Sequence, residues 1–395
     1  MNILFLNKSL DVGGVEIVSA TLANKFVQEG HGASMFAFYD TASSIEDRLN
    51  PEVKTYVQKE LKCNKQNIEA MRNVLIKDKI DIVINQWGLP YTLLRTALKA
   101  AKGLDVKFIS VYHNTPEMNG RLQTVDRQIQ ACKNPLKLIL LRMKRIAFKQ
   151  ITSAAMRYNY KHSDVFEVLS PSFVSKFEEF TGLKNHKKLK VQANPLTLDC
   201  SDFVFDPLHK TKEVIYVGRI ENDQKRVDRL LETWALVFKH CPEWNLTIVG
   251  DGKHMSETQD LANRLGLKQI TFEGFKQPKE YYKRASILAM TSEFEGFPLV
   301  LTECISFGVV PVAYGSYAAV YDIIEEGRNG LVVEKVNGQF SPQAMADALI
   351  SIMNNENARI NMARRAIEKS KMFSLDKIYM DWEETFRQFR MQKIA

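Results

Sequence analysis

The 395-residue sequence lacks three features that would each indicate a particular class of protein. No apolar run approaches the length of about 20 residues that spans a bilayer, and the N-terminal MNILFLNKSLD fits a first strand better than a signal peptide. The five cysteines are scattered without CxxC spacing, which predicts reduced thiols, a cytoplasmic location and no metal site. GxGxxG is missing after the first expected strand, so the dinucleotide fingerprint fails.

Acidic residues are also missing from residues 127–163, where Lys and Arg alternate with apolar residues. Residues 1–200 carry 29 Lys and Arg against 19 Asp and Glu, so the excess behind the net charge of +8 lies in the first half. The segment Arg127–Lys161 is predicted to form a basic amphipathic helix that contacts an anionic membrane, or an ordinary helix with a solvated basic face. It contains no recognised nucleic-acid module, so no nucleic acid is expected as a partner.

Short apolar runs alternate with helical segments along the whole chain, which predicts parallel sheets covered by helices. In the first half the expected strands are Ile3–Leu6, Met35–Phe38, Ile80–Ile84, Phe108–Tyr112, Val165–Leu169 and Lys190–Ala193. In the second half they are Val214–Gly218, Leu246–Val249, Ile270–Phe272, Ile287–Met290, Val310–Ala313 and Gly330–Val333. This α/β pattern predicts two doubly wound, Rossmann-like domains, with ligands at the carboxyl ends of the strands and in the cleft between the domains.

A polar stretch with two prolines, residues 194–212, is expected to link the two domains. We therefore predict a first domain at residues 1–200 and a second at 201–374. Residues 375–395 follow as a helix with a stripe of aromatic side chains, which predicts a buried face. That stripe covers either its own domain or the first one, and the sequence leaves both open.

Two glutamates, Glu295 and Glu303, flank a junction between an expected strand and an expected helix, and Pro298 fits the first turn of that helix. In one continuous helix they would lie about 12 Å apart along the axis, too far to share a proton but suited to two parts of one hydroxyl-rich ligand. Backbone amides free to bind phosphate are expected at the helix start. These are the amides of Gly296, Phe297 and Leu299. Carboxylates beside such amides indicate a nucleotide-sugar site.

A pair of cations follows the expected strand Val214–Gly218, with Arg219 at its end and Lys225 six residues later. The two suit one diphosphate, because the Arg guanidinium binds phosphate as a planar fork and the Lys ammonium as a point charge. Ordinary surface cations are the alternative reading.

Three further strand ends carry candidate residues. Gly13-Gly14 allows close approach of a ligand or forms a simple turn, and the turns at Gly250 and before Phe275 leave bare backbone for a base or ribose. His113 ends another strand, where an imidazole donates a hydrogen bond to a substrate hydroxyl or serves as a structural partner.

These motifs together resemble a known family. VGRI, QKRVDRLL, IVGDG and SEFEGFPLVLTECISFGVVPVAYGSYAAVYDIIEEGRNGLVV are similar to the signature half of the retaining glycosyltransferases of family 4, which have the GT-B fold. The resemblance is strong over residues 213–335. In the first half it is weaker and depends on GGVE at Gly13–Glu16 and on His113.

The resemblance implies a role for each residue of the second half. Arg219 and Lys225 would bind the donor diphosphate, Glu295 would hold sugar hydroxyls beside the anomeric carbon, and Glu303 would hold the ribose hydroxyls. Amides from Gly296 to Leu299 would meet sugar and phosphate.

In the first half it implies that Gly14 approaches the diphosphate and that His113 lies over the donor sugar. The base would lie near Gly250 and Phe275. Two departures from the family pattern concern the donor geometry: Pro298 replaces a glycine of many relatives, and the loop from Arg219 to Lys225 is one residue longer.

The activity implied is metal-independent transfer, with retention, from a nucleoside-diphosphate sugar, expected to be a UDP-sugar, to a glycan or lipid-linked acceptor. No cofactor is expected, and cationic side chains would take the place of a divalent ion. Two alternatives stay open: a UDP-sugar 2-epimerase of the same fold, and a non-catalytic protein that binds glycan or lipid.

Overall fold

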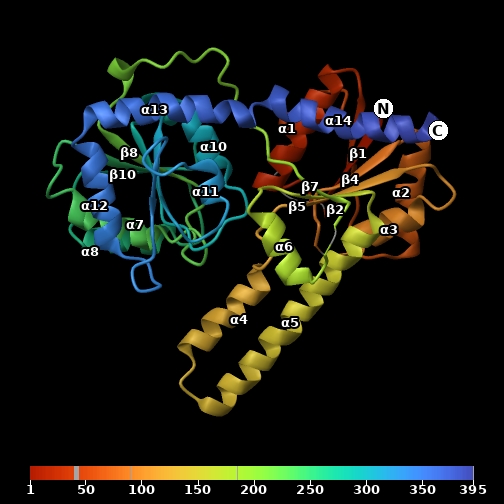
Figure 1. Cartoon of the computed structure of the whole chain (residues 1–395), viewed down its shortest axis with the longest axis horizontal. Coiled ribbons are helices and arrows are strands. Elements are labelled where there is room, and N and C mark those ends of the chain that lie inside the picture. Colours follow the sequence, from red (N-terminus) through yellow and green to blue (C-terminus); the bar gives the residue numbers. More distant parts are fainter. Residues whose placement is uncertain (40–43, 90, 185, 395) are drawn as a thin grey trace. The chain divides into compact units, whose positions relative to one another are not determined.

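The computed structural model describes residues 1–39, 44–89, 91–184 and 186–394 (Figure 1). Contacts divide the chain into two compact units, which we call unit 1 (residues 1–195 and 375–395) and unit 2 (residues 196–374). The division falls after Pro195 instead of residue 200, and the last helix groups with the first unit.

Unit 1 contains, among the described residues, a sheet of seven parallel strands in the order β3-β2-β1-β4-β5-β6-β7. The strands are β1 (Asn2–Ser9), β2 (Gly32–Tyr39), β3 (Lys54–Val57), β4 (Ile82–Asn85), β5 (Lys107–Tyr112), β6 (Val165–Val168) and β7 (Leu189–Val191). Strand β3 was not expected, because as a short edge strand it has no buried residue to produce an apolar run. All six strands that were expected in this half are present, with shifts of a few residues at their ends.

Unit 1 also contains helices, and asparagine caps the start of three of them. The helices are α1 (Gly14–Gln28), α2 (Lys65–Lys77), α3 (Thr92–Ala100), α4 (Gly120–Ala131), α5 (Pro135–His162), α6 (Phe173–Thr181) and α14 (Leu375–Ile394), with a 3₁₀ turn at Glu46–Arg48. Side chains of Asn64, Asn119 and Asn134 accept hydrogen bonds from the first-turn amides of α2, α4 and α5, which satisfies donors that have no partner inside the helix.

The aromatic stripe of α14 packs on α1. The rings of Tyr379, Trp382 and Phe386 lie 6.1, 6.1 and 5.3 Å from the ring of Phe26, measured between centroids. Trp382 and Phe386 are fully or almost fully buried there. The last helix therefore belongs to the core that covers one face of the first sheet.

Helices α4 and α5 form a hairpin that extends away from the sheet of unit 1 (Figure 1). The two helices pack along each other, and the Arg145 guanidinium pairs with the carboxylate of Asp126 between them. The basic segment predicted as one helix is thus the end of α4, a turn and the long α5.

Unit 2 contains, within the described part of the chain, six parallel strands in the order β10-β9-β8-β11-β12-β13. They are β8 (Glu213–Val217), β9 (Asn245–Val249), β10 (Ile270–Gly274), β11 (Ile287–Met290), β12 (Val310–Tyr314) and β13 (Leu331–Val333). The helices around them are α7 (Val227–Val237), α8 (Met255–Arg264), α9 (Lys279–Arg284), α10 (Leu299–Ser306), α11 (Val320–Ile323), α12 (Pro342–Met353) and α13 (Glu356–Ser370), with 3₁₀ turns at Pro207–His209 and Lys371–Phe373. Trp234 and Trp244 are fully buried in its core.

Both sheets reverse their strand order at one point. In unit 1 the reversal lies between β1 and β4, and in unit 2 between β8 and β11. In doubly wound sheets the loops that leave the two strands at such a point diverge and leave a crevice for a ligand. Side chains directly after these four strands are therefore the candidates for a ligand site.

Candidate functional site

The loops after β8 and β9 approach each other closely at two glycines. Gly218 and Gly250 both have φ of +149°, and a Cβ on Gly250 would lie 1.8 Å from the carbonyl oxygen of Gly218. A side chain at position 250 would push the two loops apart. Glycine therefore allows the loop that carries Arg219 to pack against the loop after β9. The contact of Gly250 with a base stays a prediction.

Arg219 lies two residues after the end of β8, and its side chain is exposed. Within the described part of the chain its guanidinium has no hydrogen bond or ion pair. Its carbonyl oxygen accepts a hydrogen bond of 2.9 Å from the hydroxyl of Tyr216, which fixes the backbone. The guanidinium is therefore available for an anion at the reversal point of unit 2.

Lys225 and Glu295 meet at the same reversal point and pair with each other. The Lys225 ammonium lies 2.7 Å from the Glu295 carboxylate, and the two side chains are 18% and 7% exposed. Gln224 donates to the other carboxylate oxygen of Glu295 over 3.3 Å and to the carbonyl of Phe294 over 3.2 Å. Lys225, predicted to bind the diphosphate, is thus adjacent to Glu295, predicted to bind the sugar. In the absence of ligand the charge of each side chain neutralises that of the other.

The loop from Arg219 to Lys225 is closed by its own carboxylate. Glu221 accepts hydrogen bonds from the amides of Asp223 and Gln224, over 2.9 and 3.0 Å. The carbonyl of Gln224 then accepts the amide of Glu293 over 2.7 Å, which joins the loops after β8 and β11. The longer loop is therefore an ordered turn that places Lys225 on Glu295.

Glu303 lies on α10, buried, with its carboxylate already engaged. It accepts hydrogen bonds from the hydroxyls of Thr197, over 2.5 Å, and Tyr282, over 3.3 Å. Burial and the nearby carboxylate raise the pKa of Tyr282 well above its usual value, so this phenol stays a donor. Ribose binding by Glu303 stays a prediction and would require these two hydroxyls to share the carboxylate with the ligand.

Helix α10 begins later than predicted. Pro298 is the N-cap residue with ψ of 110°, so Leu299 is the first helical residue and Gly296 lies outside the helix. The expectation of Pro298 in the first turn was wrong, because its extended ψ ends the loop instead of starting the helix. Phe297 turns its ring inward against Phe373, with 5.6 Å between centroids. Phosphate binding by the amides of Gly296, Phe297 and Leu299 stays a prediction.

Phe275 follows β10 with a side chain that is 70% exposed. An exposed ring beside the end of a strand offers a face on which a base can stack, in agreement with the predicted role but without testing it.

In unit 1, Gly13-Gly14 stands where β1 leads into α1, so it lies at the reversal point of that sheet. A Cβ on Gly13 would lie 2.5 Å from the carboxylate oxygen of Glu16, which is buried under this turn. Gly14 is the first residue of α1 and its contact with a diphosphate stays a prediction.

His113 follows β5 and contacts Gln86, which follows β4. The Nε2 atom of His113 lies 2.5 Å from Oε1 of Gln86. Burial lowers the pKa of His113 to about 3, so the imidazole is neutral near pH 7. Since Oε1 of an amide only accepts, Nε2 carries the proton and Nδ1 is left as an acceptor. Nε2 therefore donates to Gln86 and Nδ1 is the ring atom left to accept a hydrogen bond, whereas the expected donation to a substrate hydroxyl and the place of His113 over the donor sugar stay predictions.

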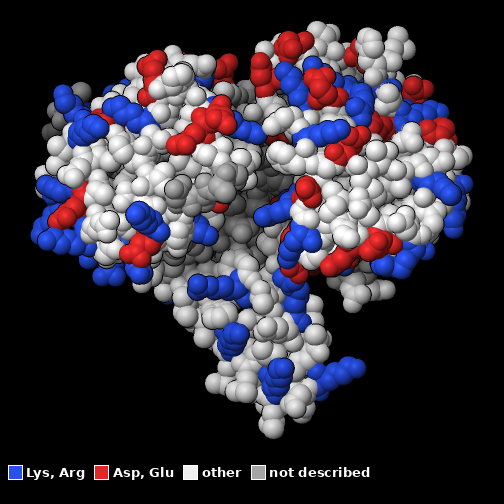
Figure 2. All heavy atoms as spheres, turned by 180° about the vertical axis from the view of Figure 1, so that it is seen from behind, with Lys and Arg blue, Asp and Glu red and all other residues white. Residues whose placement is uncertain are grey.

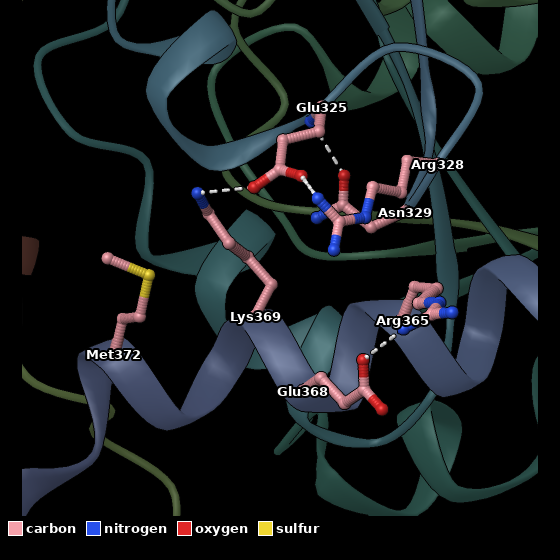
Figure 3. Close-up of a pocket in the computed structure, with 7 residues that line it drawn as sticks. All are labelled: Glu325, Arg328, Asn329, Arg365, Glu368, Lys369 and Met372. Carbon is pink, nitrogen blue, oxygen red and sulfur yellow. Dashed lines mark hydrogen bonds and ion pairs between the residues drawn. The ribbon is translucent and has the colours of Figure 1, made fainter.

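A hollow of about 190 Å³ lies elsewhere on unit 2, between α13 and the turn before β13 (Figure 3). Glu325 contacts Lys369 and Arg328 there, and Arg365 contacts Glu368. Because its charges pair with one another, the hollow has no unpaired charge to attract a ligand. It contains none of the predicted site residues.

The sequence prediction missed several residues that complete the site. Gln224, Thr197 and Tyr282 contact predicted residues, Glu221 holds the loop before Lys225, and Gln86 contacts His113. Glu221 and Gln224 lie between the predicted Arg219 and Lys225, so proximity in sequence was a usable signal. No local pattern marks the other three.

Comparisons with known proteins identify the family of each half of the chain. The description "Glycosyltransferase Family 4" matches residues 12–199, and "Glycosyl transferases group 1" matches residues 202–370. A Campylobacter jejuni protein, GalNAc-alpha-(1->4)-GalNAc-alpha-(1->3)-diNAcBac-PP-undecaprenol alpha-1,4-N-acetyl-D-galactosaminyltransferase, is 28% identical over 388 residues, 97% of each chain. Lipopolysaccharide 1,6-galactosyltransferase of Salmonella typhimurium is 30% identical over 151 residues, 36% of this chain and 41% of its own.

Among solved structures, HepE of Anabaena in complex with UDP-glucose superposes with a TM-score of 0.74 at 18% identity, covering 98% of this chain and 100% of its own. That likeness shows the fold. The predicted α/β fold of two doubly wound domains is confirmed, and the transferase matches support neither the epimerase nor the non-catalytic alternative. The chain is a glycosyltransferase with the GT-B fold, built from a Glycosyltransferase Family 4 domain and a Glycosyl transferases group 1 domain.

Proposed function

We propose that this glycosyltransferase transfers a sugar from a UDP-sugar to a glycan or lipid-linked acceptor in the assembly of a cell-surface polysaccharide. The observation that carries the proposal is the group formed by Arg219, Lys225 and Glu295 at the reversal point of unit 2. Two cations suit a diphosphate, and a buried carboxylate beside them suits sugar hydroxyls. Structures of similar fold hold UDP and UDP-glucose, which supports the choice of nucleotide.

The acceptor class is supported by relatives that act on lipid-linked and lipopolysaccharide glycans, according to their names. The proposed chemistry is transfer with retention and without a metal or cofactor. Arg219 and Lys225 stabilise the charge that develops on the leaving diphosphate, whose own oxygen assists removal of the acceptor proton. Glu295 binds sugar hydroxyls and stabilises positive charge at the anomeric carbon, and His113 accepts a hydrogen bond from a sugar hydroxyl through Nδ1 without taking its proton.

A panel of UDP, GDP and ADP sugars tests the donor first. The preferred donor raises the melting temperature, because it binds only the native state. With a lipid-linked oligosaccharide as acceptor, the same donor is consumed and its sugar enters the lipid fraction with retained configuration, in the presence of EDTA. Conversion of the donor without acceptor would identify an epimerase instead. No shift and no transfer with any donor would overturn the proposal.

The α4–α5 hairpin supplies the proposed membrane contact, in the cytoplasm at the inner face of the membrane. None of the helices in the described residues has the length and apolarity needed to cross a bilayer. Exposed apolar side chains form one stripe along α5: Leu136, Ile139, Leu140, Met143, Ile146 and Ile151. At about 100° per residue, basic side chains flank this stripe on both sides. They are Lys137, Arg142, Lys144 and Lys149.

The opposite face of α5 is used within the hairpin, since Leu141 is buried and Arg145 pairs with Asp126. Figure 2 shows blue Lys and Arg side chains and no red ones at the tip of the hairpin. An apolar stripe bordered by cations matches an anionic bilayer surface, into which the stripe sinks while the cations contact headgroups.

Vesicle sedimentation tests this contact. We expect binding to vesicles that contain phosphatidylglycerol, with weaker binding at about 1 M salt, where exposed charges are screened, and little binding to pure phosphatidylcholine. Leu140→Glu should lower binding at least about fivefold. The matched control is Leu208→Glu, an exposed leucine of unit 2. Equal binding by both variants, or no binding by the wild type, would contradict the proposed contact.

A further inference from the structure

A small cavity lined by both polar and apolar side chains lies in unit 1 between the sheet and helices α1 and α14. Its polar lining includes Gln86, His113, Glu167 and Gln192 at the strand ends and Trp382 of α14. The centre of a water molecule has about 10 Å³ to move in, which is close to the space that one ordered water needs.

The strand register explains why these side chains meet. Val111 of β5 pairs with Glu167 of β6, and Glu167 pairs with Lys190 of β7. Residues two apart along a strand point to the same face, so His113 and Gln192 share the face of Glu167. This is the face that α1 and α14 cover, and it lies at the carboxyl ends of the strands.

The cavity walls carry polar atoms without protein partners. Within the described residues, both carboxyl oxygens of Glu167, both amide atoms of Gln192, Nε2 of Gln86 and Nε1 of Trp382 make no hydrogen bond. The relative exposure of these four side chains lies between 0 and 3%. A buried polar group without a partner destabilises the fold, and a water in this space can make the two to four hydrogen bonds that several of these atoms lack.

Glu167 is in its neutral form near pH 7, because burial raises its pKa to about 8. The ammonium of Lys190 lowers this pKa, but it donates to the carbonyl of Asp381 and the hydroxyl of Thr385 on α14. His113 is the other titratable group that faces the cavity, and it is neutral as well. A protonated carboxyl has one donor and free acceptor positions, so it can hold a water between the two glutamines.

We propose that an ordered water in this cavity bridges Glu167, Gln192 and Gln86, and that Glu167 is thereby a positioning residue for His113. The bridge holds the amide of Gln86 with Nε2 toward the cavity and Oε1 toward His113. That orientation keeps the proton of His113 on Nε2 and presents Nδ1 as an acceptor. Only the use of Nδ1 on substrate rests on the proposed function.

The test reads the tautomer of His113 directly. ¹⁵N chemical shifts of histidine in the full-length protein distinguish Nε2–H from Nδ1–H, and His113→Gln identifies the signals. The wild type should show a neutral Nε2–H ring. Glu167→Gln keeps the polar contacts of a neutral carboxyl and should preserve this pattern, with turnover within twofold. Glu167→Leu and Gln192→Leu should give a mixture of tautomers and lower kcat about tenfold, with the donor KM changed less than twofold.

Phe386→Leu serves as control, since it weakens the packing of α14 without a change in the polar atoms of the cavity. It should leave the tautomer pattern intact. Identical patterns in wild type and Glu167→Leu, or an Nδ1–H ring in the wild type, would overturn the proposal. Gln192→Leu gives the same reading if Glu167→Leu does not fold. The spectra need no substrate. An Nε2–H ring of His113 together with no transfer from any donor would therefore refute the proposed function and leave the positioning role of Glu167 intact.

Discussion

Replacing Glu295 with Gln should separate donor binding from catalysis. In the ligand-free protein the Lys225 ammonium pairs with the Glu295 carboxylate over 2.7 Å. A diphosphate that uses Lys225 must weaken this pair. Glu295→Gln removes the competing charge and keeps an oxygen and the volume of the side chain. We therefore expect UDP to bind more tightly to the variant, while transfer of the sugar becomes slower.

The magnitude follows from the burial of the pair. Exposed ion pairs contribute about 0.2–1 kcal/mol and buried ones more, and this pair is 18% and 7% exposed. A competition of about 1 kcal/mol corresponds to a 3- to 10-fold lower Kd for UDP. Loss of a charged partner for sugar hydroxyls in the transition state removes about 1.5–3 kcal/mol, or a 10- to 150-fold lower kcat.

Isothermal titration with UDP and initial rates with the preferred donor measure the two effects. Glu293→Gln is the matched control, because Glu293 lies on the same loop and pairs with Arg229 at 2.6 Å instead of Lys225. It should change neither Kd nor kcat more than about twofold, well below the tenfold that 1.4 kcal/mol produces. Tenfold weaker UDP binding by Glu295→Gln, or full turnover, would refute the competition and the role of Glu295.

Three further predictions concern stability and metal dependence. Gly250→Ala should lower the free energy of unfolding by at least about 2 kcal/mol, because the new Cβ meets the Gly218 carbonyl and φ is +149°. Gly266 also has a positive φ but open space around it, so Gly266→Ala should lower the free energy of unfolding less in the same denaturant titration. The pKa of Glu167, raised to about 8 by burial, exceeds the unfolded value of 4.5, so the unfolded state binds fewer protons between these values and stability falls as pH rises. Relative to Glu167→Gln, the wild type should lose ~2 kcal/mol between pH 5 and pH 7, and an equal pH dependence would contradict a buried neutral carboxyl. Transfer should keep its rate in EDTA, and recovery of a lost rate by Mg²⁺ or Mn²⁺ would show that a metal takes part.

The sequence predicted most of the fold because buried parallel strands produce apolar runs that local reading detects. Ile287–Met290 has the predicted bounds, and Val310–Ala313 extends by one residue in the structure. Strand β3 at Lys54–Val57 escaped prediction because an exposed edge strand needs no apolar run. The start of α10 was misplaced because Pro298 fits both a cap and a first turn.

The candidate site was predicted less completely, for a topological reason. Glu295 and Lys225 were each singled out, but their ion pair depends on β8 and β11 being neighbours at the reversal point. The same limit applies to Gln86 and Glu167, which are distant in sequence and meet only through the strand register. Local patterns indicate which residue types carry chemistry, whereas strand order decides which of them contact one another.

A crystal structure of the chain with its preferred UDP-sugar would locate the donor. We expect the diphosphate to lie on Arg219 and Lys225, the sugar hydroxyls to replace the ion pair on Glu295, and the ribose to lie at Glu303. A nucleotide bound away from the reversal point of unit 2, for example in the hollow beside Glu325, would contradict this placement.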